Sequence, residues 1–154
     1  MRRMKQASQD FTVRDLAVRE IDQAFPLAQA TGTASTLAAW KTFALSLFRP
    51  DAGRERGLKA LINRHGTIVG LIAFASGSDP RHGVVLEVIH LIACDRISAG
   101  ALVEEALSIA RDRGCTMVRA DIGAGDLWLS DFLRRRFFTI ERHQFARALP
   151  SLSS

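Results

Sequence analysis

The feature that most restricts the fold of this 154-residue chain is an apolar run over residues 84–94, in which only Glu87 and His90 are polar. A strand that is covered on both faces has such a near-continuous pattern, whereas a strand with one wet face alternates apolar and polar residues. The run is also far shorter than the roughly 20 apolar residues that span a bilayer. We therefore expect a central β-strand in a sheet that carries helices on both sides.

Helix and strand patterns alternate around this central strand. Apolar residues at helical spacing predict helices over residues 16–27, from 33 or 35 to 48, from Ser98 to the closing Gly114, and from 126 to about 135. Pro26 should kink or end the first of them. Strand patterns cover residues 11–14, a hairpin over 57–74, then 116–122 and 137–149, and residues 76–80 are expected to be loop. This order predicts a mixed α/β domain.

Length and composition indicate one ordinary domain. We assign it to residues 11–149, between an N-terminal extension (1–10) and a C-terminal tail (150–154), because domains commonly have about 100–150 residues. The basic first residues are not followed by the apolar stretch of a signal peptide. Two cysteines without a Cys-x-x-Cys spacing favour a reducing, cytoplasmic location, and four widely separated histidines predict no metal site.

The net charge of +5 comes from 21 Lys and Arg against 16 Asp and Glu. Such an excess favours acidic ligands in general. The basic residues are spread along the chain, however, and cluster only at residues 2–5 and 134–136. We therefore expect a solvated basic surface and no nucleic-acid partner.

Three segments, residues 12–22, 101–121 and 129–138, resemble the GNAT superfamily of acyl-CoA-dependent N-acyltransferases. The resemblance extends over residues 11–149 and implies a GNAT-like α/β fold. It also implies direct transfer of an acyl group, with acetyl-CoA as the default donor, to a small amine or a protein amine. A homodimer is compatible with it. The alternative is a non-catalytic GNAT-like module that binds a partner or ligand, because fold alone does not establish activity.

The same resemblance implies a donor site at the end of the central strand and the start of the next helix. Its loop would be read either from Arg96 to Ala101 or with Cys94 in the place of the family's arginine, and neither reading restores the family's glycines. Asp95 adds a negative charge there, and an ordinary helix capped by Ser98 is the competing interpretation. The predicted donor-binding residues are Ile92, Ala93 and Cys94 along the pantetheine arm, Arg96 on a phosphate, and Ser98, Ala99, Gly100, Ala101 and Leu102 through their backbone.

For the chemistry, Glu87 is the predicted general base. We expect its apolar neighbours on the strand to withdraw the carboxylate from water, with an arginine-paired surface glutamate as the alternative. His90 should point to the opposite face. The acid of the family is commonly a tyrosine, but this chain contains none and has Phe132 at that position. Ser130 or a water molecule would then protonate the thiolate, or the thiolate would leave unaided.

Overall fold

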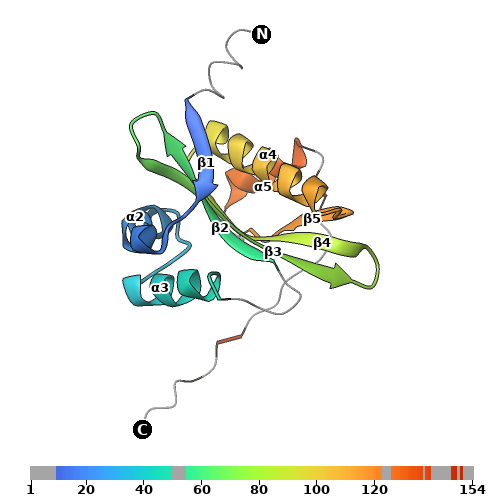
Figure 1. Ribbon diagram of the computed structural model, residues 1–154, viewed down its shortest axis with the longest axis horizontal. Coiled ribbons are helices and arrows are strands. Elements are labelled where there is room, and N and C mark those ends of the chain that lie inside the picture. Colours follow the sequence, from blue (N-terminus) through green and yellow to red (C-terminus); the bar gives the residue numbers. More distant parts are fainter. Residues whose placement is uncertain are drawn as a thin grey trace.

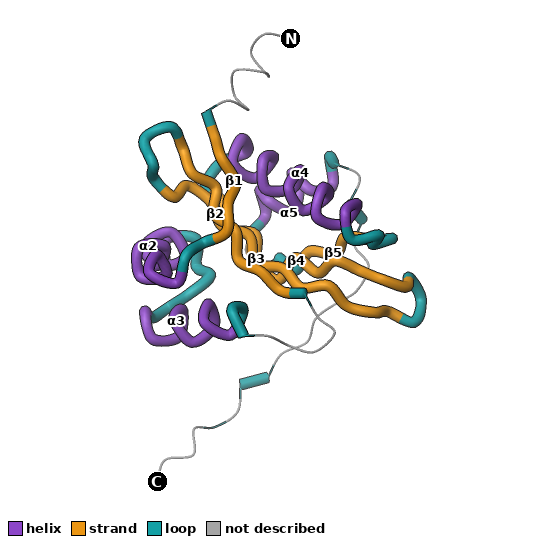
Figure 2. Tube along the Cα trace, in the orientation of Figure 1, coloured by secondary structure: helices purple, strands orange, loops and turns teal. Residues whose placement is uncertain are grey.

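The described part of the chain is built on one five-stranded sheet. The computed structural model describes residues 10–49, 55–122, 126–136, 138–139, 147–148 and 150. The strands lie in the order β1-β2-β3-β4-β5, with β1–β4 antiparallel and β5 parallel to β4. Their bounds are β1 Phe11–Asp15, β2 Arg56–Asn63, β3 Ile68–Asp79, β4 Gly83–Ala93 and β5 Met117–Ala120. Strands β3 and β4 form a long hairpin that extends past β2 (Figure 2).

Helices cover both faces of this sheet (Figure 1). A short 3-10 turn, η1 (Val18–Glu20), leads into α2 (Ile21–Ala30) and α3 (Leu37–Ser46) on one face, while α4 (Arg96–Asp112) and α5 (Leu127–Arg134) lie on the other. Alternate residues of β3 point to opposite faces of the sheet. Leu71 and Ala73 pack towards α2 and α3, whereas Ile72 and Phe74 pack towards α4. The predicted central strand is therefore confirmed as β4, with a core on each side of the sheet.

The structure confirms the predicted order of elements as far as α5. The last predicted strand, residues 137–149, lies almost entirely outside the described residues, as do most of the extension at 1–10 and the tail at 150–154.

Two local predictions are wrong. The helix does not end at Pro26 or at residue 27: α2 continues to Ala30, because the burial of Ala24 and Ala28 against the sheet outweighs the loss of one amide donor. Residues 76–79, expected to be loop, belong to β3, since they pair with residues 83–86 of β4. Cross-strand pairing with a strongly strand-forming partner outweighs the weak strand propensity of Ser, Gly and Asp.

Candidate functional site

Strands β4 and β5 run side by side for only four residue pairs and then separate. The pairs join residues 85–88 of β4 to residues 117–120 of β5, and the last link is the Asp121 amide, which donates to the Val88 carbonyl oxygen at 3.1 Å. Among the described residues, the remainder of β4 (residues 89–93) pairs with β3 alone. Alternate N–H and C=O groups of residues 89–93 therefore point away from β3, towards the gap that opens between β4 and β5. We call this side of β4 its open edge.

A β-bulge lies where the strands separate. Phe74 of β3 pairs with Val88 of β4, and the preceding Ala73 pairs with His90, so that Ile89 is an extra residue in β4. A bulge bends its strand and increases the local twist. The sequence therefore separates β4 from β5 by inserting one residue within a continuous apolar run.

The bulge also corrects the expected direction of His90. Glu87 pairs with Ala75 and His90 pairs with Ala73, and these two alanines lie on the same face of β3. Both polar residues of β4 therefore lie on the α2–α3 face, where the His90 ring meets the edge of Phe43 at a centroid distance of 5.1 Å. Simple alternation fails because the extra residue shifts the period by one. Burial lowers the pKa of His90, and the negative charge of Asp121 opposes this only in part, so the imidazole is neutral at pH 7.

Glu87 is held by an arginine on the neighbouring strand. The Arg119 guanidinium donates to Glu87 Oε1 at 3.0 Å and to Asp79 Oδ2 at 2.7 Å. The Glu87 side chain is 46% exposed, whereas that of Arg119 is 12% exposed. The expectation of a desolvated carboxylate is thus wrong, and the alternative of an arginine-paired glutamate describes this side chain. The cause is the parallel register, which sets Arg119 directly beside Glu87.

Asp79 completes this cluster at the end of the β3–β4 hairpin. Its hydrogen bond from Arg119, supported by the backbone amides of Arg81 and His82, lowers the pKa of Asp79 to about 2.

A small apolar hollow lies beneath the point of separation, on the α4 side of the sheet. Its lining comes from β3, β4, β5, α4, α5 and the residue Phe138 beyond α5: Ile72, Val88, Leu91, Val103, Ala106, Val118, Ala120, Leu133 and Phe138. The hollow is a small gap between core side chains, so it shows that this side of β4 borders the apolar core.

The first turn of α4 is that of an ordinary capped helix, as the competing interpretation has it, but the cap is Asp95 and not Ser98. Asp95 Oδ1 accepts the Ser98 amide at 2.7 Å, and Asp95 Oδ2 lies 3.2 Å from the Ser98 hydroxyl. The helix consequently begins at Arg96, directly after a two-residue connection from β4. Aspartate and serine are both good N-cap residues. Asp95 lies nearer to the end of β4 than Ser98, so a cap at Asp95 gives a longer helix than a cap at Ser98 would.

Solved structures show what this arrangement is similar to. An aminoglycoside N-acetyltransferase in complex with CoA matches at 13% identity with a TM-score of 0.73, over 90% of this chain and 94% of that one. A ribosomal-protein-alanine N-acetyltransferase from Brucella melitensis matches at 14% identity with a TM-score of 0.70, over 91% and 99%. A GNAT family acetyltransferase from Staphylococcus aureus matches at 11% identity with a TM-score of 0.67, over 91% and 99%. The chain has the GNAT fold.

Sequence comparison adds nothing to this, since no protein-family model and no curated protein matches the chain. At such low identity the structural likeness concerns the fold, and a transcriptional regulator from Bacillus halodurans also matches, at 12% identity with a TM-score of 0.72, over 90% of this chain and 99% of that one. The GNAT fold therefore leaves open which chemistry, if any, this chain performs.

The structure brings the predicted donor-binding residues of this GNAT fold together at one end of β4 and α4. Most of these residues are buried: Ile92, Ala93, Ser98, Ala99, Gly100 and Leu102. Cys94 and Arg96 are exposed, and Ala101 is half-buried. Direct contact with a ligand would therefore come from Cys94, Arg96 and backbone atoms, so the donor-site assignment stays a prediction.

The predicted acid position offers no proton donor. Phe132 is buried on α5, where its ring carries the Arg136 guanidinium at 4.7 Å. Neither a membrane-crossing helix nor a group of three His, Cys, Asp or Glu side chains able to hold a metal ion occurs within the described residues.

The role of Asp95 can be tested through stability. Asp95→Ala should lower the free energy of unfolding by about 1 kcal/mol, because the Ser98 amide loses its acceptor. Asp95→Ser should stay within about 0.3 kcal/mol of the parent, since serine caps as well as aspartate. Urea unfolding measures both, and an equal loss in the two variants would contradict capping by this side chain.

The Arg119–Asp79 ion pair should be visible in the acid stability. The folded-state pKa of Asp79 is about 2, below an unfolded value of about 3.9, so its contribution is present above pH 4 and is lost as the pH falls towards 2. We expect the melting temperature of Asp79→Asn to lie below that of the parent at pH 5 and to approach it towards pH 2. A difference that is constant between pH 2 and pH 5 would disprove this linkage.

Proposed function

We propose that this chain transfers an acyl group from a thioester donor, by likeness acetyl-CoA, directly to an amine. The observation that carries the proposal is the separation of β4 from β5 after Val88 and Ala120. Among the residues that the structure describes, it leaves the edge of residues 89–93 unpaired, next to a small apolar hollow. A thioester carbonyl lying against that edge accepts a backbone N–H of β4, which stabilises the oxyanion of the tetrahedral intermediate.

Donor and acceptor approach this edge from opposite faces of the sheet. The donor arm runs along residues 92–94 towards α4, which lies on one face. The amine reaches the acyl carbon from the α2–α3 face, where Glu87 and His90 are displayed. This arrangement fits a direct attack without a covalent enzyme intermediate. The acceptor is a small amine or a protein amine; the acetyltransferases of similar fold act on aminoglycosides and on ribosomal-protein alanine.

Glu87 remains the proposed base that takes the proton from the attacking ammonium. It lies one residue before the last paired residue of β4, and Arg119 fixes its carboxylate in position. Its exposure allows one water molecule to relay the proton. His90 is the competing base, because it lies on the same face and is neutral.

Proton donation to the thiolate needs no tyrosine. A thiol has a pKa of about 8.5, so a thiolate is a tolerable leaving group near neutral pH. A proton from water, passed directly or through the Ser130 hydroxyl of α5, neutralises the thiolate after it departs.

A second function, binding without transfer, is favoured by two specific observations. The predicted base is tied to Arg119, and the first turn of α4 is occupied by its own cap. The two functions differ in whether a bound donor is consumed.

A turnover assay distinguishes acyl transfer from binding without transfer. With acetyl-CoA or acetyl-pantetheine at millimolar concentration and a panel of primary amines, we expect free thiol to be released only when amine is present. A thiol reagent and mass spectrometry of the acetylated amine measure this reaction. A donor that raises the melting temperature without any release of thiol would establish binding without transfer.

Active-site variants then locate the base. Glu87→Gln should lower kcat by about 100-fold or more, because general-base catalysis contributes 10²–10⁴-fold, while donor binding is retained. Glu55→Gln is the matched control, since Glu55 is also an exposed glutamate paired with an arginine, Arg113. A loss of turnover in His90→Gln with full activity in Glu87→Gln would transfer the role to His90.

A further inference from the structure

The first turn of α4 already contains an anion, supplied by the chain itself. Asp95 accepts the Ser98 amide with one carboxylate oxygen and lies within hydrogen-bond distance of the Ser98 hydroxyl with the other. A phosphate at a helix start relies on the same two features, outward-pointing amides and the positive end of the helix dipole. The carboxylate of Asp95 therefore takes the place that a donor's diphosphate would need.

Little backbone remains free at this position. The Ala99 amide donates to the Asp95 carbonyl oxygen at 3.1 Å, and later amides belong to the helix. In the first turn of α4, the amides of Arg96 and Ile97 have no acceptor among the described residues. The Arg96 side chain, which is 58% exposed, lies 4.0 Å from Asp131 of α5.

Gly100, the residue directly after the first turn of α4, is covered as well. A Cβ atom on Gly100 would lie 3.1 Å from Arg136 Nη2. The same guanidinium packs on Phe132 at 4.7 Å and lies 3.6 Å from Glu104. The absence of a side chain at Gly100 thus accommodates Arg136 of this chain, where a glycine in a phosphate loop would admit a ligand.

We propose that Asp95 closes the start of α4 to a diphosphate, so that this chain selects thioester donors by their pantetheine arm and not by their phosphates. The inference about donor choice rests on the proposed function, while the closure of α4 stands on geometry alone. It implies that acetyl-pantetheine binds within about threefold of acetyl-CoA, since the phosphates find only the Arg96 and Ile97 amides without an acceptor and meet a like charge at Asp95.

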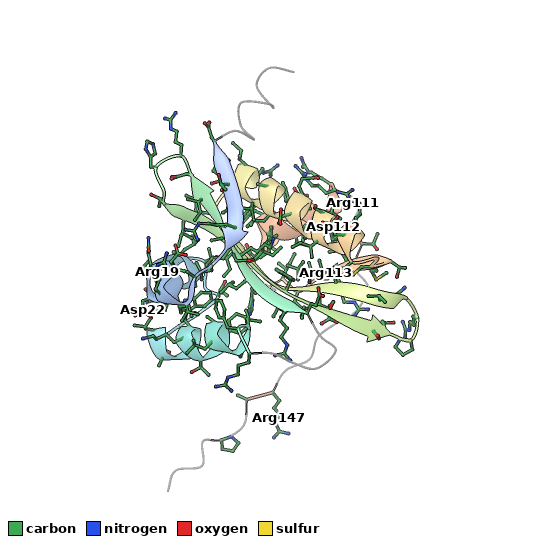
Figure 3. All side chains as sticks on the ribbon, in the orientation of Figure 1. Arg19, Asp22, Arg111, Asp112, Arg113 and Arg147 are labelled. Atoms are coloured by element: carbon green, nitrogen blue, oxygen red, sulfur yellow. The ribbon has the colours of Figure 1, made fainter. Side chains whose placement is uncertain are left out.

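The closure is tested with 3′-phospho-ADP, the half of CoA that carries the diphosphate, by calorimetry. The parent should bind it at least about tenfold more weakly than Asp95→Ser, because serine removes the negative charge and leaves the Ser98 amide with a neutral acceptor, which a phosphate oxygen displaces more readily than a carboxylate. Asp112→Ser is the matched control, because it removes the same charge from the other end of α4 (Figure 3) and should leave binding unchanged. Circular dichroism of each variant confirms that it is folded.

Each outcome is decisive for the closure. Gain of binding in Asp95→Ser but not in Asp112→Ser supports it. Equal binding by the parent and Asp95→Ser, an equal gain in both variants, or no binding by any of the three proteins overturns it. The donor comparison is scored separately: a parent that binds acetyl-CoA more than about tenfold tighter than acetyl-pantetheine overturns the inference about donor choice, whereas a parent that binds neither donor overturns the proposed function as well.

Discussion

The rest of the site depends on one departure from regular pairing, the loss of β5 as a partner of β4 beyond Val88. Backbone polar groups inside a domain are almost always paired, since leaving one unpaired costs about as much as a hydrogen bond. The side chains that line the adjoining hollow are all apolar and provide no substitute. The open edge therefore has hydrogen-bonding capacity that those neighbouring side chains do not use, and this makes the separation of the strands, more than any single side chain, the argument for a ligand.

Charge plays a different part from the one that a net value of +5 suggests. Several described arginines are paired with carboxylates of this chain: Arg14 with Glu20, Arg119 with Asp79 and Glu87, Arg136 with Glu104, and Arg135 with Asp131. The exposed pairs contribute little to stability. They do neutralise basic groups near the site, such as Arg119 and Arg136. The attraction of a charged ligand to the site therefore depends on these local pairs more than on the net positive charge of the chain.

Patterns in the sequence were sufficient for the layers of the fold and insufficient for the details of the site. The long apolar run at residues 84–94 predicts a doubly covered strand, and the structure confirms it as β4. The bulge at Ile89 has no such signature, because an apolar residue inserted in an apolar run leaves the pattern unchanged. The face of the sheet on which His90 lies depends on this bulge, so the sequence pattern does not predict it. The cap was ambiguous for a related reason, as Asp95 and Ser98 are equally suited by residue type and only the hydrogen-bond geometry distinguishes them. The pairing of Glu87 with Arg119 depends on strand register across 32 positions of chain, which local patterns do not encode.

The two departures of this chain from the usual GNAT pattern act on different steps. Contacts to a donor's phosphates are the same in the ground state and in the transition state, so their loss raises the donor concentration that is needed without lowering the rate of the bound complex. The edge of β4 and the base act on the atoms whose charge changes, and these alone affect kcat. A carboxylate at the start of α4 is therefore compatible with an active transferase of altered donor preference. The absence of a tyrosine bears on the departure of the thiolate, which the low basicity of thiolates makes the least demanding of the proton transfers.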